Sequence, residues 1–466
     1  MADAQRPAPN ADTPGMDEWR RIVAALKGRD PSTLASHTIG GVPIEPLYER
    51  RRDPPHFSPR KAGPWTIVQT VDNPDPDRAN DQAREDVEGG ATGLALSFAG
   101  GMLTGASGLA STAKALAVAL DGIDLAAIHI RIEPHARGPD LARTLEDFVA
   151  QSGVAPELAS IAFGLDPIVS FASNERTEAP ECAELVARFQ MLRAAGFRGS
   201  LAVADGQLFH EAGASEAQEL AAILAASVWW LRALENAGEA PDIVMPFLGA
   251  SIAVDRDQFL SLAKLRALRL LWRRLQELCG VSPILLQVHA ATSRRMMTRA
   301  DPHTNLLRTT IAAFTAAVGG ADSIAILPFD AAIGASQRGA RALARNIQHL
   351  LMTESQLFRI ADPAAGSGAF EALTSELAER SWQAFQDIER EGGIVASLRA
   401  GKLQSRIAAS RGALKAELAA GRTPLVGSNI HRDPTAGDAI TGEEQGAASI
   451  AGLAPIRLEA MTGPSA

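Results

Sequence analysis

Short apolar or β-branched runs recur along this chain at a nearly constant step, and the spacing restricts the possible fold more than any other feature. The runs cover residues 65–70, 93–98, 126–132, 160–163, 200–204, 242–247, 284–289 and 323–327. They start roughly 30 to 40 residues apart, which is the length of a βα unit. Helical patterns lie between them, at 109–120, 216–237 and 257–278. We therefore predict an α/β fold, a (β/α)8 TIM barrel over residues 61–335.

A doubly wound open sheet is the main alternative, because it is built from the same βα units. That fold carries a G-x-G-x-x-G phosphate fingerprint after its first strand, and the fingerprint is missing here. The closed barrel is therefore the better prediction.

Two regions lie outside the predicted barrel. Residues 1–60 form an N-terminal arm, in which we expect a short amphipathic helix within "DEWRRIVAALKG" and then an extended, proline-containing run. Residues 336–430 form a helical extension, with helices expected at 336–351 and 370–391. Residues 431–466 are rich in Gly, Ala and Ser, so we expect a flexible tail.

The composition excludes several classes of protein. The net charge is −9, and no basic stripe indicates nucleic-acid binding. The two cysteines, Cys182 and Cys279, are far apart, which fits a reducing compartment and no metal cluster. Apolar stretches are too short or too interrupted to span a membrane, and the N-terminal stretch has no signal-peptide core. We expect a cytoplasmic protein that binds neither nucleic acid nor membranes.

In a barrel enzyme the functional groups lie where the strands end. The predicted ends and the loops after them supply Gln69, Thr70, Arg131, Glu133, Asp166, Asp205, His210, Phe247, His289 and Phe329. Glu133 with His135, and His210 with Glu211, are candidate acid–base pairs. The alternative is that these are the ordinary polar residues of a barrel mouth. His289 fits a substrate contact and a hydrogen-bonded core histidine equally well.

One stretch, "GQLFHEAGAS" at 206–215, places a histidine, a glutamate and two glycines between a predicted strand and a long predicted helix. TIM barrels keep catalytic groups in such loops, so this is either an active site or the remnant of one. A second stretch, "FAGGMLTGASG" at 98–108, is a glycine-rich turn that could cradle phosphate. It lacks the GK[ST] ending of a P-loop, and a flexible βα loop is the alternative.

Several stretches together resemble one enzyme family. "PWTIVQT", residues 64–70, resembles the "PWTIRQY" stretch at the first barrel strand of methylmalonyl-CoA mutases. Residues 293–334, beginning "SRRMMTRADP", are similar to the helix and eighth strand of that family, and 344–394 also resemble it. The forms "SRRMMTRADP" and "GGVPIEPLYERR" are closer to the small, β-type subunit than to the large one. The resemblance runs, with gaps, from about residue 17 to 430.

The resemblance implies a chemistry and an assembly. Members of the family use adenosylcobalamin to interconvert methylmalonyl-CoA and succinyl-CoA through radicals. The CoA chain threads the barrel, and a flavodoxin-like domain holds the corrin over its mouth. After "GRTPLVGSNIHRDP" about thirty residues remain, fewer than the roughly 100 that such a domain needs. We expect no corrin-binding domain and no cofactor bound by this chain, with adenosylcobalamin held by a partner.

The same resemblance implies that the catalytic residues are replaced. Catalytic subunits read Tyr-His-Met-Gln-Glu-Ala-Gly-Ala where this chain has residues 207–214. Leu208 stands in place of the active-site histidine, Gln207 in place of a tyrosine, and Thr70 in place of another tyrosine. His210 lies two positions later and does not inherit the role by alignment, so any substrate contact by His210 or His289 would be a separate one. Loss of one preorganised hydrogen-bond donor costs about 3 kcal/mol of transition-state stabilisation.

"DPHTNL", residues 301–306, is similar to the Asp-x-His-x-x-Gly pattern by which corrinoid domains ligate cobalt. Leu306 stands where the glycine is needed, so we expect a loop and helix start with Asp301 as the N-cap.

Three hypotheses follow. The first is a non-catalytic small subunit, which forms a heterodimer with a large catalytic methylmalonyl-CoA mutase subunit. The second is an active barrel that works with a separately encoded corrin-binding chain, and the third is a repurposed acyl-CoA-binding protein. For the first, the arm is the expected subunit contact, because its helix has an apolar face of Trp19, Ile22, Val23 and Leu26.

Overall fold

Eight parallel strands form the centre of the structure, a computed structural model that describes residues 15–27, 30–51, 53, 60–101, 108–172, 180–432 and 452–462. The strands are β3 (Thr66–Val71), β4 (Gly93–Leu96), β5 (His129–Ile132), β6 (Ile161–Ala162), β7 (Ala202–Asp205), β8 (Leu248–Val254), β9 (Gln287–Thr292) and β10 (Ser323–Ala325). Their order in the sheet is β6-β5-β4-β3-β10-β9-β8-β7.

The two outer strands of this order meet each other. Backbone hydrogen bonds run from Phe163 N to Ser200 O (3.0 Å) and from Val203 N to Leu165 O (2.9 Å), which joins the β6 and β7 segments. The sheet therefore closes on itself, as a TIM barrel requires, and the predicted fold class is confirmed.

The sixth predicted strand is wrong. Residues 242–247 are helical, in α9 (Pro241–Val244) and the 3-10 turn η2 (Met245–Phe247), and the strand follows as β8. Pro241 fixes a helical φ at the first position of α9, and Pro246 has no N–H to donate to a sheet. Phe247 therefore precedes its strand and lies at the end of the barrel opposite the mouth. The seventh strand also runs later than expected, over Gln287–Thr292, which places His289 inside it.

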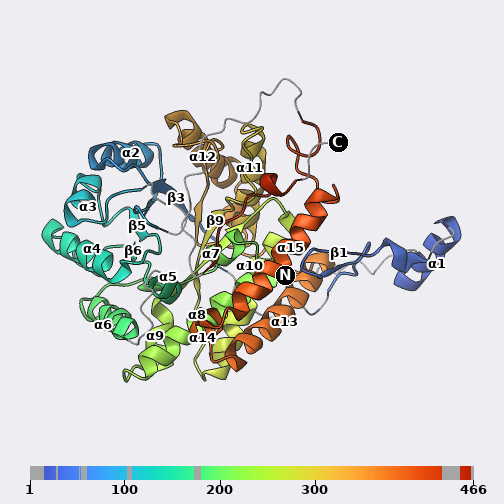
Figure 1. Ribbon diagram of the computed structural model, residues 1–466, viewed down its shortest axis with the longest axis horizontal. Helices are drawn as coiled ribbons and strands as arrows, with labels where there is room; N and C mark the ends of the chain where they lie inside the picture. The colour runs from blue at the N-terminus through green and yellow to red at the C-terminus, as the bar shows by residue number, and fades with distance from the viewer. Residues whose placement is uncertain are drawn as a thin grey trace, which may run out of the picture.

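Helices surround the sheet (Figure 1). They are α2 (Pro76–Glu88), α3 (Ala113–Ala119), α4 (Gly138–Ser152), α5 (Pro167–Ala172), α6 (Pro180–Ala194), α7 (Gln207–Glu211), α8 (Glu216–Glu235), α10 (Gln258–Leu278), α11 (Thr304–Val318) and α12 (Arg338–His349). Local signals set the ends of the long ones. Ser215 and Gln218 form a capping box at the start of α8, and the Asp257 carboxylate caps α10 by accepting from Leu260 N (3.0 Å).

Helix α12 belongs to the barrel, although residue 336 was expected to begin the extension. It follows the eighth strand and packs against α2, α11 and β3. After it come a π-turn η3 (Leu350–Glu354) and a 3-10 turn η4 (Leu357–Arg359). The extension proper consists of α13 (Gly368–Arg390), α14 (Ile394–Arg399) and α15 (Lys402–Ala419).

Helix α13 lies across α8 and α10 on the outside of the barrel (Figure 1). Arg266 of α10 joins the two layers, with its guanidinium bonded to Glu371 (2.7 Å), Asp362 (3.1 Å) and Thr374 (3.1 Å). Arg266 and Glu371 are buried. The long helix α8 is consequently covered on both sides, which explains why its sequence has no polar stripe.

The ends of the chain behave differently from each other. In the arm, α1 (Met16–Lys27) and the turn η1 (Pro31–Leu34) project away from the barrel (Figure 1). The short strands β1 (Ser36–His37) and β2 (Pro43–Ile44) lie against it, because Val42 between them is buried in the core and Gly40 lies beside Ser215. Residues 452–462, within the region expected to be a flexible tail, instead pack against the barrel and include a 3-10 turn η5 (Glu459–Met461). The described end of this region is therefore held by the barrel.

Among the described residues, no helix combines the length and apolar character needed to cross a membrane. The same residues contain no cluster of His, Cys, Asp and Glu side chains that could hold a metal ion.

Arg266→Met should destabilise the fold, because it leaves Glu371 buried without its cation. We expect the free energy of unfolding to fall by about 3–5 kcal/mol, the usual result of removing one partner of a buried ion pair. Arg273→Met on the same helix is the matched control, since Arg273 pairs with Glu277 at the surface, where such pairs contribute about 0–1 kcal/mol. Denaturant unfolding of both variants measures the difference, and equal losses would contradict the role given to Arg266.

Candidate functional site

A narrow cavity lies at the carboxyl ends of the strands. Its volume of about 50 Å³ holds a few water molecules. Of the residues singled out in the sequence, it is lined by Thr70, Glu133, His135, Asp205, Gln207, Glu211 and His289. The loop 206–215 is therefore at the mouth of the barrel, as predicted from its position after a strand.

The three positions at which the family resemblance implies replaced catalytic residues are also at the mouth. Thr70 lines the cavity from β3, and Gln207 lines it from the first turn of α7. The Leu208 side chain is buried in the hydrophobic core. None of the three can act as a general acid or base at neutral pH.

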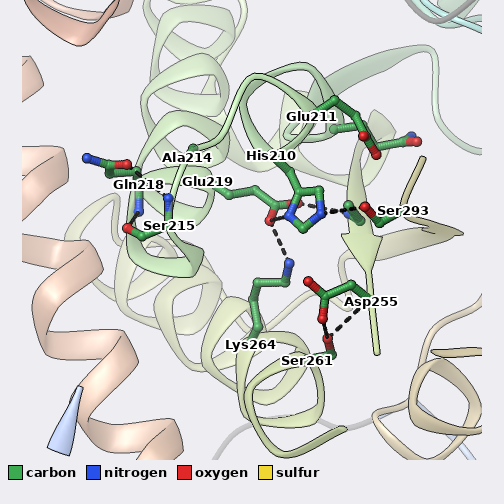
Figure 2. Close-up of polar contacts among 12 residues, drawn as sticks. His210, Glu211, Ala214, Ser215, Gln218, Glu219, Asp255, Ser261, Lys264 and Ser293 are labelled. Carbon is green, nitrogen blue, oxygen red and sulfur yellow. Dashed lines mark hydrogen bonds and ion pairs between the residues drawn. The ribbon is translucent and has the colours of Figure 1, made fainter. Parts of the chain in front are cut away.

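His210 does not line the cavity, and its side chain lies in a buried polar network (Figure 2). Its Nε2 hydrogen-bonds with Ser293 Oγ (2.8 Å), and its Nδ1 lies 3.4 Å from a Glu219 oxygen. The same oxygen lies 2.6 Å from Lys264 Nζ. Burial, and then the charges of Arg295 and Lys264, hold the pKa of His210 well below its usual range. The imidazole is consequently neutral, and the structure does not bring it to a position where it would meet a ligand in the cavity.

Glu211 lines the cavity, but its carboxylate is already engaged. One oxygen accepts from Arg294 N and the other from Arg295 N, both at 2.8 Å. Burial raises the pKa of Glu211, and the bond from Arg294 N opposes that shift. The predicted His210–Glu211 acid–base pair is therefore absent, because each side chain stabilises a different neighbouring segment. The stretch 206–215 works as a structural corner of the barrel.

The other predicted pair, Glu133 with His135, is also not formed. His135 Nε2 hydrogen-bonds with Ala99 O (3.0 Å), and its Nδ1 accepts from Arg137 N (3.0 Å). Glu133 instead accepts from Arg131 Nε (3.1 Å). Both imidazole nitrogens are thus committed to backbone groups.

Arg131 and His289 fill the centre of the barrel at mid-height. The Arg131 guanidinium bonds to Glu133 on its own strand and to Ser251 on β8, across the barrel. His289 Nδ1 hydrogen-bonds with Ser323 Oγ (2.8 Å) on β10. Both side chains are only 4% exposed. The structure therefore places His289 as a buried, hydrogen-bonded histidine, and burial holds its pKa well below the usual range.

A larger pocket of about 320 Å³ lies at the opposite, amino-terminal end of the barrel. Its polar lining includes Thr66, His129, Ser160, Ser200, Gln287 and Ser323. His289 is common to the linings of this pocket and of the mouth cavity, whereas Arg131 belongs to this one alone. His289 therefore lies in the wall that the two spaces share, and the described residues divide the bore into these two pockets.

The remaining candidates lie outside the cavity. Gln69 bonds to Asp86 and to Arg341 O, Phe329 stacks on His303, and Asp166 caps α5 through Ile168 N (2.8 Å). Of the glycine-rich stretch 98–108, residues 102–107 are outside the described part of the chain. The Asp301 carboxylate accepts from Thr304 N (3.2 Å), the first residue of α11, whereas the N-cap position itself is occupied by His303.

Sequence reasoning missed Glu219 and Lys264. Lys264 lies four residues from both Leu260 and Leu268, on the apolar face of α10, and all three are buried. A cation at such a position is the signal that could have revealed a buried partner, because charged residues are rarely buried unless they are paired.

Asp205 and Asp166 are adjacent buried carboxyls at the mouth. Burial, followed by the nearby Asp166, raises the pKa of Asp205 to about 8, and Arg131 at 4.0 Å only partly opposes this. Burial raises the pKa of Asp166 to about 6. Asp205 is thus mainly protonated at neutral pH, so it acts as a neutral group that packs beside Arg131.

Asp205→Asn should remove a pH dependence of stability. A carboxyl whose pKa rises from 3.8 to about 8 on folding favours the folded state fully below pH 4, and that contribution is lost as pH rises towards 8. The free energy of unfolding of the wild type should therefore fall relative to the variant by up to about 1.4 kcal/mol per pH unit. Denaturant unfolding between pH 5 and 8 measures this, with Asp140→Asn on the exposed face of α4 as the control. Parallel curves for wild type and Asp205→Asn would contradict the raised pKa.

Three curated relatives are similar to the chain over long stretches. The methylmalonyl-CoA mutase small subunit of Streptomyces virginiae is 38% identical over 88% of this chain and 69% of its own length. The probable methylmalonyl-CoA mutase small subunit of Mycobacterium tuberculosis (strain H37Rv) is 47% identical over 51% of the chain and 39% of its own length. The small subunit of Propionibacterium freudenreichii is 31% identical over 81% of the chain and 62% of its own length. The chain thus spans between about two fifths and two thirds of these relatives.

The match to a family model covers most of the chain. The model described as methylmalonyl-CoA mutase matches residues 32–446, which include the barrel, the helical extension and part of the arm. Together with the relatives and the closed eight-stranded barrel, this establishes that the chain belongs to the methylmalonyl-CoA mutase family.

Proposed function

We propose that this chain is the non-catalytic small subunit of an adenosylcobalamin-dependent methylmalonyl-CoA mutase. In this proposal a larger homologous subunit carries out the isomerisation, and the present chain stabilises it in a heterodimer. The small-subunit names of the Streptomyces, Mycobacterium and Propionibacterium relatives support the assignment.

The observation that carries the proposal is the closed bore. Arg131 and His289 are both buried inside the barrel and line the pocket at its amino-terminal end, and a cavity of about 50 Å³ remains at the mouth. An acyl-CoA chain that threaded this barrel would have to displace a buried guanidinium from Glu133 and Ser251. Separating a buried charge from its hydrogen-bond and ion-pair partners costs several kcal/mol of free energy. The same obstacle counts against an active barrel that borrows a corrin-binding chain.

The residues at the mouth do not fit a corrin cofactor. His210 and His289 are buried and hydrogen-bonded to serines, and the imidazole of His135 is bonded at both nitrogens. In the stretch 301–306, His303 stacks on Phe329 and the Asp301 carboxylate accepts from Thr304 N. We propose that the partner subunit, and not this chain, holds adenosylcobalamin.

The arm is the proposed contact with the partner. Helix α1 projects away from the barrel (Figure 1), so the barrel does not cover its apolar face, which includes Trp19, Ile22 and Val23. Ile22 is 37% exposed. Aromatic and aliphatic anchors of this kind are typical of interface hot spots.

A repurposed acyl-CoA-binding protein is the second candidate, and the amino-terminal pocket favours it. That pocket of about 320 Å³ is lined by hydroxyl groups of Thr66, Ser160, Ser200 and Ser323. Calorimetric titration of the isolated chain with CoA distinguishes the two proposals. Stoichiometric binding at micromolar concentration would favour the second, whereas the first requires none.

Mouth-cavity variants should leave turnover unchanged in the complex. We expect Glu133→Gln in this chain to alter kcat of the reconstituted mutase by less than twofold, because the reaction occurs in the partner's barrel. The isolated chain with adenosylcobalamin should show no turnover, and Leu208→His should not restore it, since Gln207, Thr70 and the closed bore remain. A hundredfold loss of kcat in Glu133→Gln would show that this barrel catalyses.

Removing the apolar face of α1 should weaken the heterodimer. We expect Trp19→Ala with Ile22→Ala to raise the Kd for the large subunit at least tenfold, while the unfolding midpoint stays the same because α1 lies away from the barrel. Arg20→Ala is the control, since its side chain is exposed beside Asp17. Analytical ultracentrifugation measures both. An unchanged Kd would remove the arm from the interface, and no complex between the wild-type chains would overturn the proposed partnership itself.

A further inference from the structure

A segment remote in sequence from the barrel is bound at the edge of its mouth. Residues 452–462 cross two loops there, the one that contains α7 and the one that follows β9. Ile456 N donates to Glu211 O (2.8 Å), and Leu458 N donates to Arg295 O (2.9 Å). The segment therefore ties the two loops together through their backbones.

Glu459 gives the segment its most specific contact. One carboxylate oxygen accepts from Arg299 N (2.7 Å), and the other accepts from Ala300 N (2.9 Å) and from Ser428 Oγ (3.2 Å). Two successive backbone N–H groups that converge on one carboxylate form charge-assisted hydrogen bonds, which are stronger than neutral ones.

Apolar contacts complete the docking. Leu453 and Leu458 are 2% and 4% exposed. Ile456 lies over Gly213, where a Cβ would come within 3.2 Å of Ile456 Cδ1 and 2.9 Å of Arg411 Cβ. Gly213 also has φ of +101°, which only glycine adopts readily. The glycine of the "HEAGA" stretch thus makes room for this segment as well as for the turn.

The segment does not line the mouth cavity itself, but it holds residues that do. Glu211 and Arg294 are part of the cavity wall. Glu211 is bound by Ile456 through its carbonyl group, and its carboxylate accepts from Arg294 N. Glu459 fixes the same loop five residues further along, at Arg299. A movement of the segment would therefore be passed to the cavity wall through Glu211.

We propose that residues 452–462 are a latch that holds one wall of the mouth cavity in its closed position. The hydrogen bonds of the Glu459 carboxylate are the main contact that keeps the latch in place. The segment is held by a small set of hydrogen bonds and by two leucines, whereas the barrel strands are held by a continuous ladder. Segments of this kind open locally at a lower free energy than global unfolding. Release of the latch lets the 293–301 loop and α7 move apart and widens the cavity. This proposal is independent of the one made for the whole chain.

Thiol access to the cavity tests the latch in the full chain. Thr70→Cys places a thiol in the cavity wall, in a background in which Cys182 and Cys279 are replaced by serine. We expect Glu459→Ala to raise the rate of labelling by iodoacetamide at least tenfold, with the unfolding midpoint unchanged. Leu458→Ser should do the same by removing a buried anchor. The matched control is Glu417→Ala, which removes a carboxylate that pairs with Arg422 on the surface of α15 and should leave the rate unchanged.

Hydrogen exchange on the same variants separates a latch from general loosening. We expect faster exchange in 207–214, 293–301 and 452–462, with α13 unchanged. Labelling rates equal to wild type in both latch variants would overturn the proposal. Faster exchange throughout the barrel would also overturn it, because the cause would then be global destabilisation.

Discussion

The ion pair between Glu219 and Lys264 is the interaction on which this corner of the barrel depends. Both side chains are almost fully buried, and Glu219 also accepts from Ala253 N (2.8 Å). One carboxylate therefore joins α8, α10 and β8, and through His210 it reaches α7 (Figure 2). The buried charge of Glu219 is tolerated because both carboxylate oxygens have hydrogen-bond or ion-pair partners. Removal of Glu219 or Lys264 would leave the other charge buried without its counter-ion. The pair thus contacts the loop 206–215 through His210.

The mouth keeps many polar residues, yet most of them serve structure. Glu211 closes the 293–301 loop onto α7, Arg131 bridges β5 and β8, and Asp205 is a neutral group at pH 7. The Glu211 carboxylate is held in place by two backbone N–H groups, and a neutral buried imidazole is a poor general acid. These residues look like catalytic candidates in the sequence, whereas in the structure their hydrogen bonds hold neighbouring segments of the barrel together.

The sequence predicts the barrel well because the step between apolar runs reflects a repeated βα unit, which many residues specify together. It fails at 242–247, where two prolines decide the local structure against an apolar pattern that also fits a strand. The mouth position of Thr70, Gln207 and Glu211 follows from the fold and could be predicted. The direction of His210 could not, since it depends on Glu219, Lys264 and Ser293, which come from three other segments. The docking of residues 452–462 could not be predicted from the sequence for the same reason. The segment has the composition of a loop, and its hydrogen-bond partners are mostly backbone groups of loops that are distant in the sequence.

The two terminal regions differ in how far their apolar and charged side chains contact the rest of the chain. Residues 452–462 have their leucines buried, and the Glu459 carboxylate accepts three hydrogen bonds, so these groups are engaged within the chain. The arm is the reverse case. Its residues near 51 are held against α13 by the bond from Arg51 to Ser375 (3.2 Å), whereas α1 leaves its apolar face uncovered by the barrel (Figure 1). An amphipathic helix of this length is marginal by itself in water, and its stability comes from packing. Within the described residues the barrel does not pack on this helix, which fits the proposal that its apolar face binds a partner molecule.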